Sequence, residues 1–370
     1  MKLTPFKLER YFARHEHSAP YLLSSSDCES MKLRDLLAFE PDAKQRFESL
    51  WLGYTESSGG PKLRQSISRL YQNLDSDRIL VHSGAEEAIF NFMNVKLSAG
   101  DHVIVHSPCY QSLSEVALGI GAEVSYWQGD PDRRWELDLE DLKSLLTGRT
   151  KVVVVNFPHN PTGFLPTRDF LFELSALSEH HGFSIFSDEV YRGLELDPSE
   201  RLPALVEISD NAVSLGVMSK AYGLAGLRIG WIATRDHRLL KELEAFKDYT
   251  TICNSAPSEF LATLALRSSE AIVERNLRII RRNLDRLDLF FESHRDRFSW
   301  DRPKAGSIAF PKLLKGKVEK FCADLLENTG VLLLPGTLYG KRFNSFRIGF
   351  GRKNLPDALI RLEKYLRENS

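Results

Sequence analysis

The chain has 370 residues, of which 42% are hydrophobic and 27% are charged, and its formal net charge is −1. A chain of this length exceeds the size at which one hydrophobic core usually stops growing, so we expect two packed units. The near-zero net charge provides no basic field that could hold nucleic acid or an acidic membrane. It therefore argues against a nucleic-acid partner.

The four cysteines are scattered along the chain, at Cys28, Cys109, Cys253 and Cys322. Neither a disulfide framework nor a zinc site fits this spacing, so we expect no metal. The first residues, MKLTPFKLERYFARHEH, are charged and lack the apolar stretch of a secretory signal. No apolar run reaches the roughly 18 residues that a membrane span needs. We therefore expect a cytoplasmic protein in a reducing environment.

Apolar runs alternate with helix-patterned stretches over most of the chain. The expected strands are residues 78–82, 102–106, 122–127, 151–156, 183–187, 212–217 and 229–233. The expected helices between them are residues 62–71, 86–97, 137–146, 169–181 and 238–247. This alternation predicts an α/β fold with a mostly parallel, seven-stranded sheet that is covered on both faces. In such sheets ligands bind at the C-terminal ends of the strands.

A long, charged helix pattern over residues 268–295 predicts a connector into a second unit. The rest of the chain shows short strands and two helices, around residues 318–328 and 355–368. These features predict a smaller α+β domain to which the N-terminal segment returns. We expect residues 1–45 to join this small domain, residues 46–280 to form the large domain, and residues 281–370 to form the connector and the small domain.

The segment SKAYGLAGLRIGW, residues 219–231, follows the strand expected at 212–217. Lysine is rarely buried without a purpose, and Lys220 stands among small and apolar residues that allow close backbone approach. A desolvated ammonium loses its proton more easily, which yields the free amine that can attack an aldehyde. Eight residues later, Arg228 offers a planar fork suited to a phosphate.

This segment resembles the lysine motif of the aspartate-aminotransferase-like enzymes (fold type I, class I/II), which depend on pyridoxal phosphate (PLP). Further motifs follow in the order of that family over nearly the whole chain. The resemblance implies that Lys220 binds PLP as a Schiff base and that Arg228 binds its phosphate. Relatives often have Ser or Thr three places before the lysine, where this chain has Val217. That leaves Ser219 and Arg228 as the phosphate ligands of this segment.

Two further strand ends carry polar motifs. On its own, NFPHNPTG (residues 156–163) indicates a turn before a helix. The resemblance makes Asn160 a donor to the phenolic oxygen of PLP, which a carboxamide can be without adding charge. In FSDEVYRGL (residues 186–194), a carboxylate could simply cap a helix. The resemblance places Asp188 against the pyridine nitrogen, which keeps the ring an electron acceptor, and Tyr191 at the phenolic oxygen.

The segment HSGAEEAIF passes from a strand into a helix. There Gly84, Ala85 and Glu86 would present backbone N–H groups at a helix N-terminus, which is a ready anion site. Beside Arg228 they would complete a phosphate cup. In SPCYQSL, Tyr110 matches the aromatic residue that stacks on the cofactor ring, although an ordinary core or rim aromatic is the alternative.

An arginine within a β-patterned run, as in SFRIGFG, usually lies on a solvated face. The resemblance instead makes Arg347 the clamp for the substrate α-carboxylate, with Asn160 beside it. Tyr54, in GYTESSGGPKLR, matches a tyrosine that reaches the phosphate of the neighbouring subunit. This implies a homodimer with shared active sites, whereas a turn tyrosine without a function is the alternative.

The segment LLSSSDCES, residues 22–30, stands where many relatives have a glycine-containing loop over the substrate. It could be a polar surface loop. Its hydroxyls, such as that of Ser24, or its carboxylates could instead lie near the substrate side chain. In that case they favour a polar or basic amino acid as the substrate. Several motifs are most similar to the branch that includes capreomycidine synthase, an enzyme that cyclises an arginine derivative on the same fold.

The sequence therefore predicts an aminotransferase that moves an amino group from an amino acid to a 2-oxo acid. Lys220 would carry PLP and then move the proton between the substrate Cα and the cofactor C4′. A PLP-dependent lyase or cyclase acting on a polar or basic amino acid is the alternative, because the same residues begin those reactions. The sensor half of a transcription regulator is a further alternative, but such proteins carry a basic DNA-binding module before the PLP domain, and the N-terminus here is too short for one.

Overall fold

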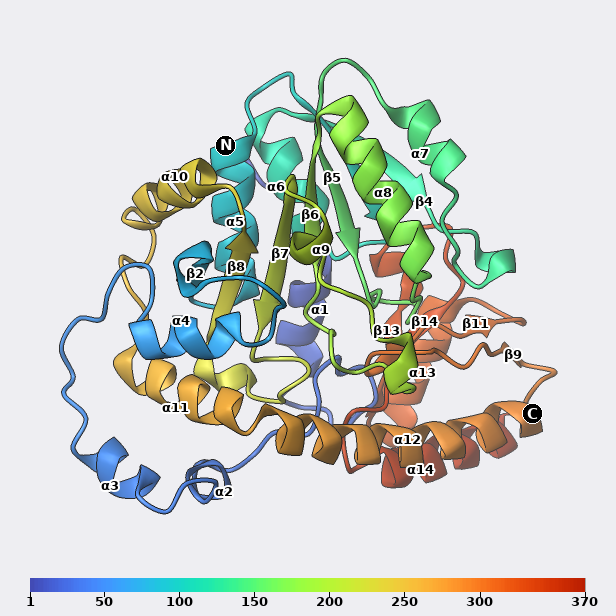
Figure 1. The fold of residues 1–370 in the computed structure, drawn as a ribbon. Helices are drawn as coiled ribbons and strands as arrows, with labels where there is room; N and C mark the ends of the chain where they lie inside the picture. Colours follow the sequence, from blue (N-terminus) through green and yellow to red (C-terminus); the bar gives the residue numbers. More distant parts are fainter. Residues whose placement is uncertain (370) are drawn as a thin grey trace.

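The computed structural model describes residues 1–369 and is built around one seven-stranded sheet (Figure 1). Its strands are β2 (Ile79–His82), β3 (His102–Ser107), β4 (Glu123–Gln128), β5 (Thr150–Asn156), β6 (Ser184–Asp188), β7 (Ala212–Val217) and β8 (Gly230–Thr234). The strand order is β2-β8-β7-β6-β5-β3-β4. Strand β8 runs antiparallel to both of its neighbours, and the other pairings are parallel. The prediction of a mostly parallel α/β sheet is thus confirmed.

The central strands are apolar throughout because both of their faces are covered. On β5, Val152 and Val154 pack into one core, and Val153 and Val155 pack into another on the opposite face. This alternation follows from the two-residue period of a strand. Helices α5 (Ala85–Lys96), α6 (Ser112–Ile120) and α10 (His237–Lys247) lie on the first face. Helices α7 (Leu139–Leu145), α8 (Arg168–His181) and α9 (Leu205–Ile208) cover the second (Figure 1).

Local signals account for the ends of these helices. Helix α8 begins where the Thr167 hydroxyl accepts a hydrogen bond from the Phe170 N–H, at 3.2 Å, and ends at Gly182 in the left-handed conformation. The amphipathic helix expected after residue 268 is α12 (Ser269–Ser293), which runs along one edge of the molecule toward the C-terminal elements (Figure 1). Before it come α4 (Pro61–Ser68) and α11 (Ala256–Arg267), the second of which the sequence patterns missed.

The C-terminal part contains short strands and two helices, as expected. Its elements are β9 (Phe298–Ser299), β10 (Ile308–Ala309), β11 (Lys312–Leu313), α13 (Val318–Thr329), β12 (Val331–Leu332), β13 (Leu334–Pro335), β14 (Phe346–Gly349) and α14 (Leu355–Glu368). Strand β14 lies between β10 and β13. The arginine-bearing motif SFRIGFG therefore occupies a central strand rather than an edge.

The N-terminal segment lies on two different parts of the molecule. Strand β1 (Tyr21–Leu22) pairs in parallel with β12. Helices α2 (Leu33–Leu37) and α3 (Ala43–Glu48) instead contact α11. The domain boundaries at residues 45 and 280 stay a prediction. Within residues 1–369, no helix is both long and apolar enough to cross a membrane.

Helix α1 (Lys7–His15), which the sequence patterns did not predict, lies between the sheet and the C-terminal elements (Figure 1). At one end, the Lys7 N–H donates to the side chain of Gln111, at 2.9 Å. Further along, the Tyr11 hydroxyl donates to the Leu333 carbonyl, at 3.0 Å. Helix α1 therefore spans the two parts of the molecule at the place where the motif residues converge.

Candidate active site

Lys220 lies in a tight turn that follows the C-terminal end of β7. Its Nζ donates a hydrogen bond to the Ser26 hydroxyl, at 2.8 Å. Burial lowers the pKa of Lys220, and the positive charge of Arg347 acts in the same direction, while Asp27 and Asp188 oppose the shift. The amine of Lys220 is therefore available at a lower pH than that of a surface lysine.

Asp188 ends β6, the strand next to β7, as the fold predicted for a partner of Lys220. The side chain is buried, and Oδ1 accepts a hydrogen bond from the Val190 N–H, at 3.2 Å. Burial raises the pKa of Asp188 to about 7, and the charge of Lys220 partly opposes this shift. A buried carboxylate with a single backbone donor has the capacity to hold a protonated ring nitrogen.

Arg347 lies on β14 and is only 2% exposed, so the alternative of a solvated face is wrong. Its Nη1 donates to the Tyr339 hydroxyl at 2.8 Å and to Asn160 Oδ1 at 3.3 Å. The Tyr339 hydroxyl donates in turn to the same Asn160 oxygen, at 2.9 Å. The Asn160 N–H is held by Asn156 Oδ1, at 2.7 Å. These contacts orient a guanidinium and a carboxamide toward one another.

The segment around Ser24 is buried, so the alternative of a polar surface loop is wrong. Ser24 is fully buried, and its carbonyl oxygen accepts from Arg347 Nε and Nη2, at 3.1 and 2.7 Å. The Ser24 hydroxyl has no hydrogen-bond partner among the described residues. Arg352 binds Asp27 through two hydrogen bonds, at 3.1 and 2.9 Å. The segment thus holds Arg347 through its backbone.

The start of α5 and Arg228 approach each other closely enough to form an anion cradle. Gly84 has a φ of +91°, and a Cβ atom at this position would lie 2.5 Å from Arg228 Nη2. Arg228 itself adopts the left-handed conformation, with a φ of 50°, which is uncommon for a residue other than glycine. The Ser219 hydroxyl is buried and has no partner among the described residues. The absence of a Cβ at Gly84 keeps the space beside the guanidinium open.

The α5 cradle joins a helix N-terminus, at Gly84 and Ala85, to a cationic side chain. Next to them, the Glu86 carboxylate accepts a hydrogen bond from the Ser112 hydroxyl, at 3.1 Å. The orphaned Ser219 hydroxyl adds a neutral donor. Backbone N–H groups, a guanidinium and a hydroxyl together fit a phosphate.

The three predicted tyrosines have different environments. Tyr110 is half-buried, packs its ring 4.9 Å from that of Phe6 and donates its hydroxyl to Glu9 Oε1, at 2.8 Å. Tyr191 is buried beside Ser26 and Arg347, and burial raises the pKa of its hydroxyl. Tyr54 is 86% exposed and lies outside the cluster within this chain.

Several residues at the site were missed or not singled out from the sequence. His159, inside NFPHNPTG, is buried, and its ring nitrogens contact Thr162 Oγ1 and the Pro108 carbonyl oxygen, each at 2.7 Å. Because the carbonyl can only accept, Nε2 carries the proton. Burial lowers the pKa of His159 to about 3, so the ring is neutral and ties the loop before Tyr110 to the Asn160 loop.

Glu9 and Tyr339 were not assigned a role either, and Ser26 was considered only as one of several hydroxyls in residues 22–30. The partners of Glu9 and Ser26, which are Tyr110 and Lys220, lie 101 and 194 positions away in the sequence. Tyr339 contacts Arg347, eight positions along the chain, and Asn160, 179 positions away. The only signal that could have pointed to Asn156 and His159 was their place in a polar motif at the end of an apolar strand. For Glu9 no such signal exists, because it stands in a helix among other charged residues.

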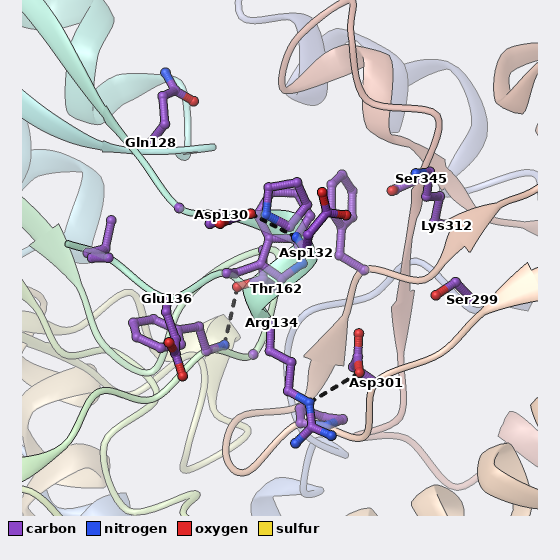
Figure 2. A pocket seen from close by; sticks show the side chains of 18 of the residues that line it. Gln128, Asp130, Asp132, Arg134, Glu136, Thr162, Ser299, Asp301, Lys312 and Ser345 are labelled. Atoms are coloured by element: carbon purple, nitrogen blue, oxygen red, sulfur yellow. Dashed lines mark hydrogen bonds and ion pairs between the residues drawn. The ribbon is translucent and has the colours of Figure 1, made fainter. Parts of the chain in front are cut away.

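A large cavity lies elsewhere, between the segment after β4 and the C-terminal part (Figure 2). Its volume is about 1070 Å³, and Lys220 is not among its lining residues. Arg134 and Asp301 form an ion pair at 3.4 Å within it (Figure 2). Thr162 and Ser345 line its walls, whereas Asn160 and Arg347 do not. The convergence of polar groups, and not cavity volume, therefore identifies the site.

Comparison with known protein families supports a single assignment. A family model described as aminotransferase class I and II matches residues 21–361. Capreomycidine synthase from Streptomyces vinaceus is 31% identical over 366 residues, which cover 97% of this chain and 91% of that protein. A probable aspartate aminotransferase from Methanocaldococcus jannaschii is 29% identical over 357 residues, which cover 90% of this chain and 91% of that protein.

Two solved structures are similar over the whole chain. A PLP-dependent aminotransferase from Streptococcus suis has a TM-score of 0.94 and 34% identity and covers 100% of this chain and 99% of that one. The PLP-dependent cyclase OrfR has a TM-score of 0.92 and 30% identity, with coverages of 100% and 99%. Together with the phosphate cradle and the partly buried lysine, these matches identify pyridoxal phosphate as the cofactor. The chain belongs to the class I and II aminotransferase family of PLP-dependent enzymes.

Proposed function

We propose that the protein is an aminotransferase that moves an amino group from an amino acid to a 2-oxo acid. The observation that carries the proposal is the convergence of Lys220, Asp188 and Arg347, which come from the turn after β7, from β6 and from β14. An amine that can take a proton, a carboxylate suited to a ring nitrogen and a carboxylate clamp are the groups that transamination requires.

The residues of the site fit the cofactor. Arg228, Ser219 and the start of α5 would hold its phosphate, Asp188 its ring nitrogen, and Asn160 and Tyr191 its phenolic oxygen. When it is bound to Lys220, PLP supplies an electron-accepting ring for the electrons of the substrate Cα–H bond.

Three side chains of this protein would then have separate roles in the reaction. Arg347 binds the substrate α-carboxylate through its guanidinium, because Ser24 and Tyr339 already fix the direction of this group. Lys220, once released, takes the proton from Cα and returns it at C4′. Burial lowers its pKa, which makes the amine a proton acceptor at a lower pH than that of a surface lysine. Asp188 keeps the proton on the ring nitrogen.

A screen of the holoenzyme against single amino acids, with basic ones included, tests the proposal. A substrate should remove the absorbance of the lysine-bound cofactor and release its 2-oxo acid, identified by mass. Denaturation should then yield pyridoxamine phosphate. If an amino acid is consumed without a 2-oxo acid and without pyridoxamine phosphate, the enzyme is not an aminotransferase.

A second candidate is a PLP-dependent lyase or cyclase that acts on a polar or basic amino acid. Glu9, on α1, favours it, since its carboxylate reaches Tyr110 beside the site and forms no ion pair within residues 1–369. An unpaired carboxylate beside the site would favour a cationic substrate side chain. The similarity to capreomycidine synthase and to the cyclase OrfR points the same way. Products that keep the amino nitrogen after a single turnover would establish this candidate.

We further propose a homodimer in which Tyr54 reaches the phosphate of the neighbouring subunit. Trp51, Leu52 and Tyr54 are exposed large side chains on one segment, and Tyr249 and Ile252 are exposed on another. A hydrogen bond from the Thr55 hydroxyl to the Asn254 carbonyl, at 3.0 Å, joins the two segments. Exposed apolar side chains gathered in this way are typical of an interface.

We also propose that the protein works in the cytoplasm. Cys28, Cys109, Cys253 and Cys322 are all free thiols. Free thiols persist in a reducing compartment. Fractionation of the source cells, followed by detection of the protein, tests this proposal.

A further inference from the structure

The amine of Lys220 makes a single hydrogen bond within residues 1–369, and that bond is to the hydroxyl of Ser26. The distance from Nζ to Oγ is 2.8 Å, and the two residues are 194 positions apart in the chain. A lysine arm has four flexible carbons, so the direction of its free amine is not set by its own backbone. Ser26 is the group that sets it here.

Ser26 is itself held in place on both sides. Its carbonyl oxygen accepts from the Ser307 hydroxyl, at 2.7 Å. The next residue, Asp27, is bound by Arg352 through two hydrogen bonds. On the other side, the Ser24 carbonyl holds Arg347. The hydroxyl of Ser26 therefore projects toward Lys220 from a segment that has little freedom to move.

We propose that Ser26 is a positioning residue for Lys220. Once substrate has released the lysine amine from the cofactor, the Ser26 hydroxyl accepts a hydrogen bond from that amine. This inference rests on the proposed role of Lys220 as the group that moves the Cα proton. When the neutral amine takes that proton, it becomes an ammonium, and its N–H bond to Ser26 becomes charge-assisted and stronger. Ser26 thus favours proton uptake. When the ammonium returns the proton, the contact weakens again, and Ser26 itself loses no atom.

The segment from Ser24 to Ser26 also sets the distance between Lys220, the proposed base, and the substrate. Ser24 orients Arg347, which would clamp the α-carboxylate, and Ser26 orients Lys220. Both Arg347 and Lys220 are thereby held by the same short segment. Their relative placement then depends less on how β14 packs against the large sheet.

Four charged groups also act on Lys220, each from a different part of the chain. They are Asp27 beside Ser26, Asp188 on β6, Arg347 on β14 and Glu9 on α1. A substitution at position 26 leaves all four in the chain. A change in the titration of Lys220 that depends on the hydroxyl therefore reports the loss of the Ser26 contact.

The experiment uses the full-length protein freed of its cofactor and mixed with pyridoxal phosphate between pH 6 and pH 10. The rate at which the Lys220 adduct forms, followed by absorbance, gives the pH midpoint of the lysine, because only the free amine reacts. Ser26→Ala should lower this midpoint by about one pH unit, since the ammonium loses an acceptor. Ser26→Thr, which keeps the hydroxyl, should restore the wild-type midpoint.

Ser25→Ala is the matched control, because it removes a neighbouring buried hydroxyl that has no hydrogen-bond partner among the described residues. It should leave the midpoint unchanged. Ser26→Cys, which keeps the size of the side chain but is a weak acceptor, should shift the midpoint in the same direction as alanine and covers the case in which Ser26→Ala does not fold. Wild-type midpoints in both the alanine and the cysteine variants would overturn the inference.

This measurement is independent of turnover. Adduct formation needs no amino acid, so a failure of transamination leaves the Lys220 titration readable. Conversely, a titration that is insensitive to Ser26 in an enzyme that transaminates would reject the role of Ser26 alone.

Discussion

Single side chains at this site carry charge where water is largely excluded. Burial raises the pKa of Asp188 to about 7 and lowers that of Lys220, and the charge of each partly opposes the shift of the other. Both groups are consequently closer to the point of proton exchange at neutral pH than surface groups are. This makes them sensitive to the cofactor, whose ring nitrogen would add a proton beside Asp188.

Asp188→Asn should change the pH dependence of stability in the cofactor-free protein. Because the folded state raises the pKa of Asp188, the protonated carboxyl stabilises the fold fully below the ordinary value near 3.8, and this stabilisation is lost as the pH rises through about 7. The asparagine variant does not titrate at this position, so its stability does not fall with pH for this reason. Between pH 5 and pH 8, wild type should lose about 2 to 3 kcal/mol relative to the variant. Urea unfolding at both pH values measures the difference, and an equal difference at the two values would contradict the burial of a titrating Asp188.

Lys220→Ala should abolish the absorbance of the lysine-bound cofactor, because no other amine occupies its place at the end of β7. PLP should still bind without a covalent bond, through the phosphate cradle at Gly84 and Arg228. Turnover should fall by at least about 100-fold, since the proton at Cα loses its carrier. Spectra and rates of the reconstituted variant provide the measurement. Persistence of the adduct would show that a different residue binds the cofactor.

At the scale of elements, the site is assembled where strand ends meet elements from both chain ends. Strands β6 and β7 bring Asp188 and Lys220, whereas β14 brings Arg347. Helix α5 contributes its N-terminus, and the glycine before it decides how close Arg228 can come. The cradle is therefore a property of backbone approach as much as of side chains.

Gly84→Ala should weaken PLP binding by about 10-fold or more, because its Cβ would lie 2.5 Å from Arg228 Nη2 and would displace the guanidinium. The matched control is Gly100→Ala. Gly100 has a similar positive φ of +87°, but a Cβ there meets no atom within 4 Å. Both variants bear the conformational cost of a left-handed alanine, and only the first should lose cofactor affinity. Equilibrium titration with PLP separates them, and equal affinities would argue against the cradle.

For the whole molecule, the proposed dimer depends on two exposed apolar segments. Tyr249, which is 90% exposed, stands on one of them, and Trp51 stands on the other. If the segments are covered by a second copy of the chain, the active site includes residues of both subunits.

Tyr249→Glu should convert the dimer to monomers, because it places a charge in an apolar contact. Leu289→Glu is the control, since Leu289 is also exposed, at 72%, but lies on α12, away from both segments. Sedimentation at a fixed concentration measures the outcome. A dimer that survives Tyr249→Glu would remove this face from the proposed interface.

Mixing two inactive variants tests whether Tyr54 acts on the neighbouring subunit. A mixed dimer of Lys220→Ala and Tyr54→Phe would contain one site with both residues intact. Random exchange of subunits should therefore restore about a quarter of wild-type activity. No recovery, under conditions in which the subunits exchange, would confine Tyr54 to its own chain.

Much of this molecule was predictable because strand and helix patterns record burial along a local stretch of backbone. All seven strands of the large sheet were predicted, since residues such as Val152–Val155 are buried on both faces. The motifs that hold Lys220, Asp188 and Asn160 could be placed in the fold from the sequence, because each lies at the end of a strand. The sequence by itself therefore determined the sheet, the cofactor and the family.

Only the tertiary structure decided which distant segments share the site. The reversed direction of β8, the position of α1 over the site and the insertion of Ser24 and Ser26 between Arg347 and Lys220 have no local signal. Glu9 contacts a residue 101 positions away, and Ser26 contacts one 194 positions away. Tyr339 contacts one residue eight positions away and another 179 positions away. Such contacts follow from how whole elements pack, because periodicity in one segment specifies that a face is buried but not which partner covers it.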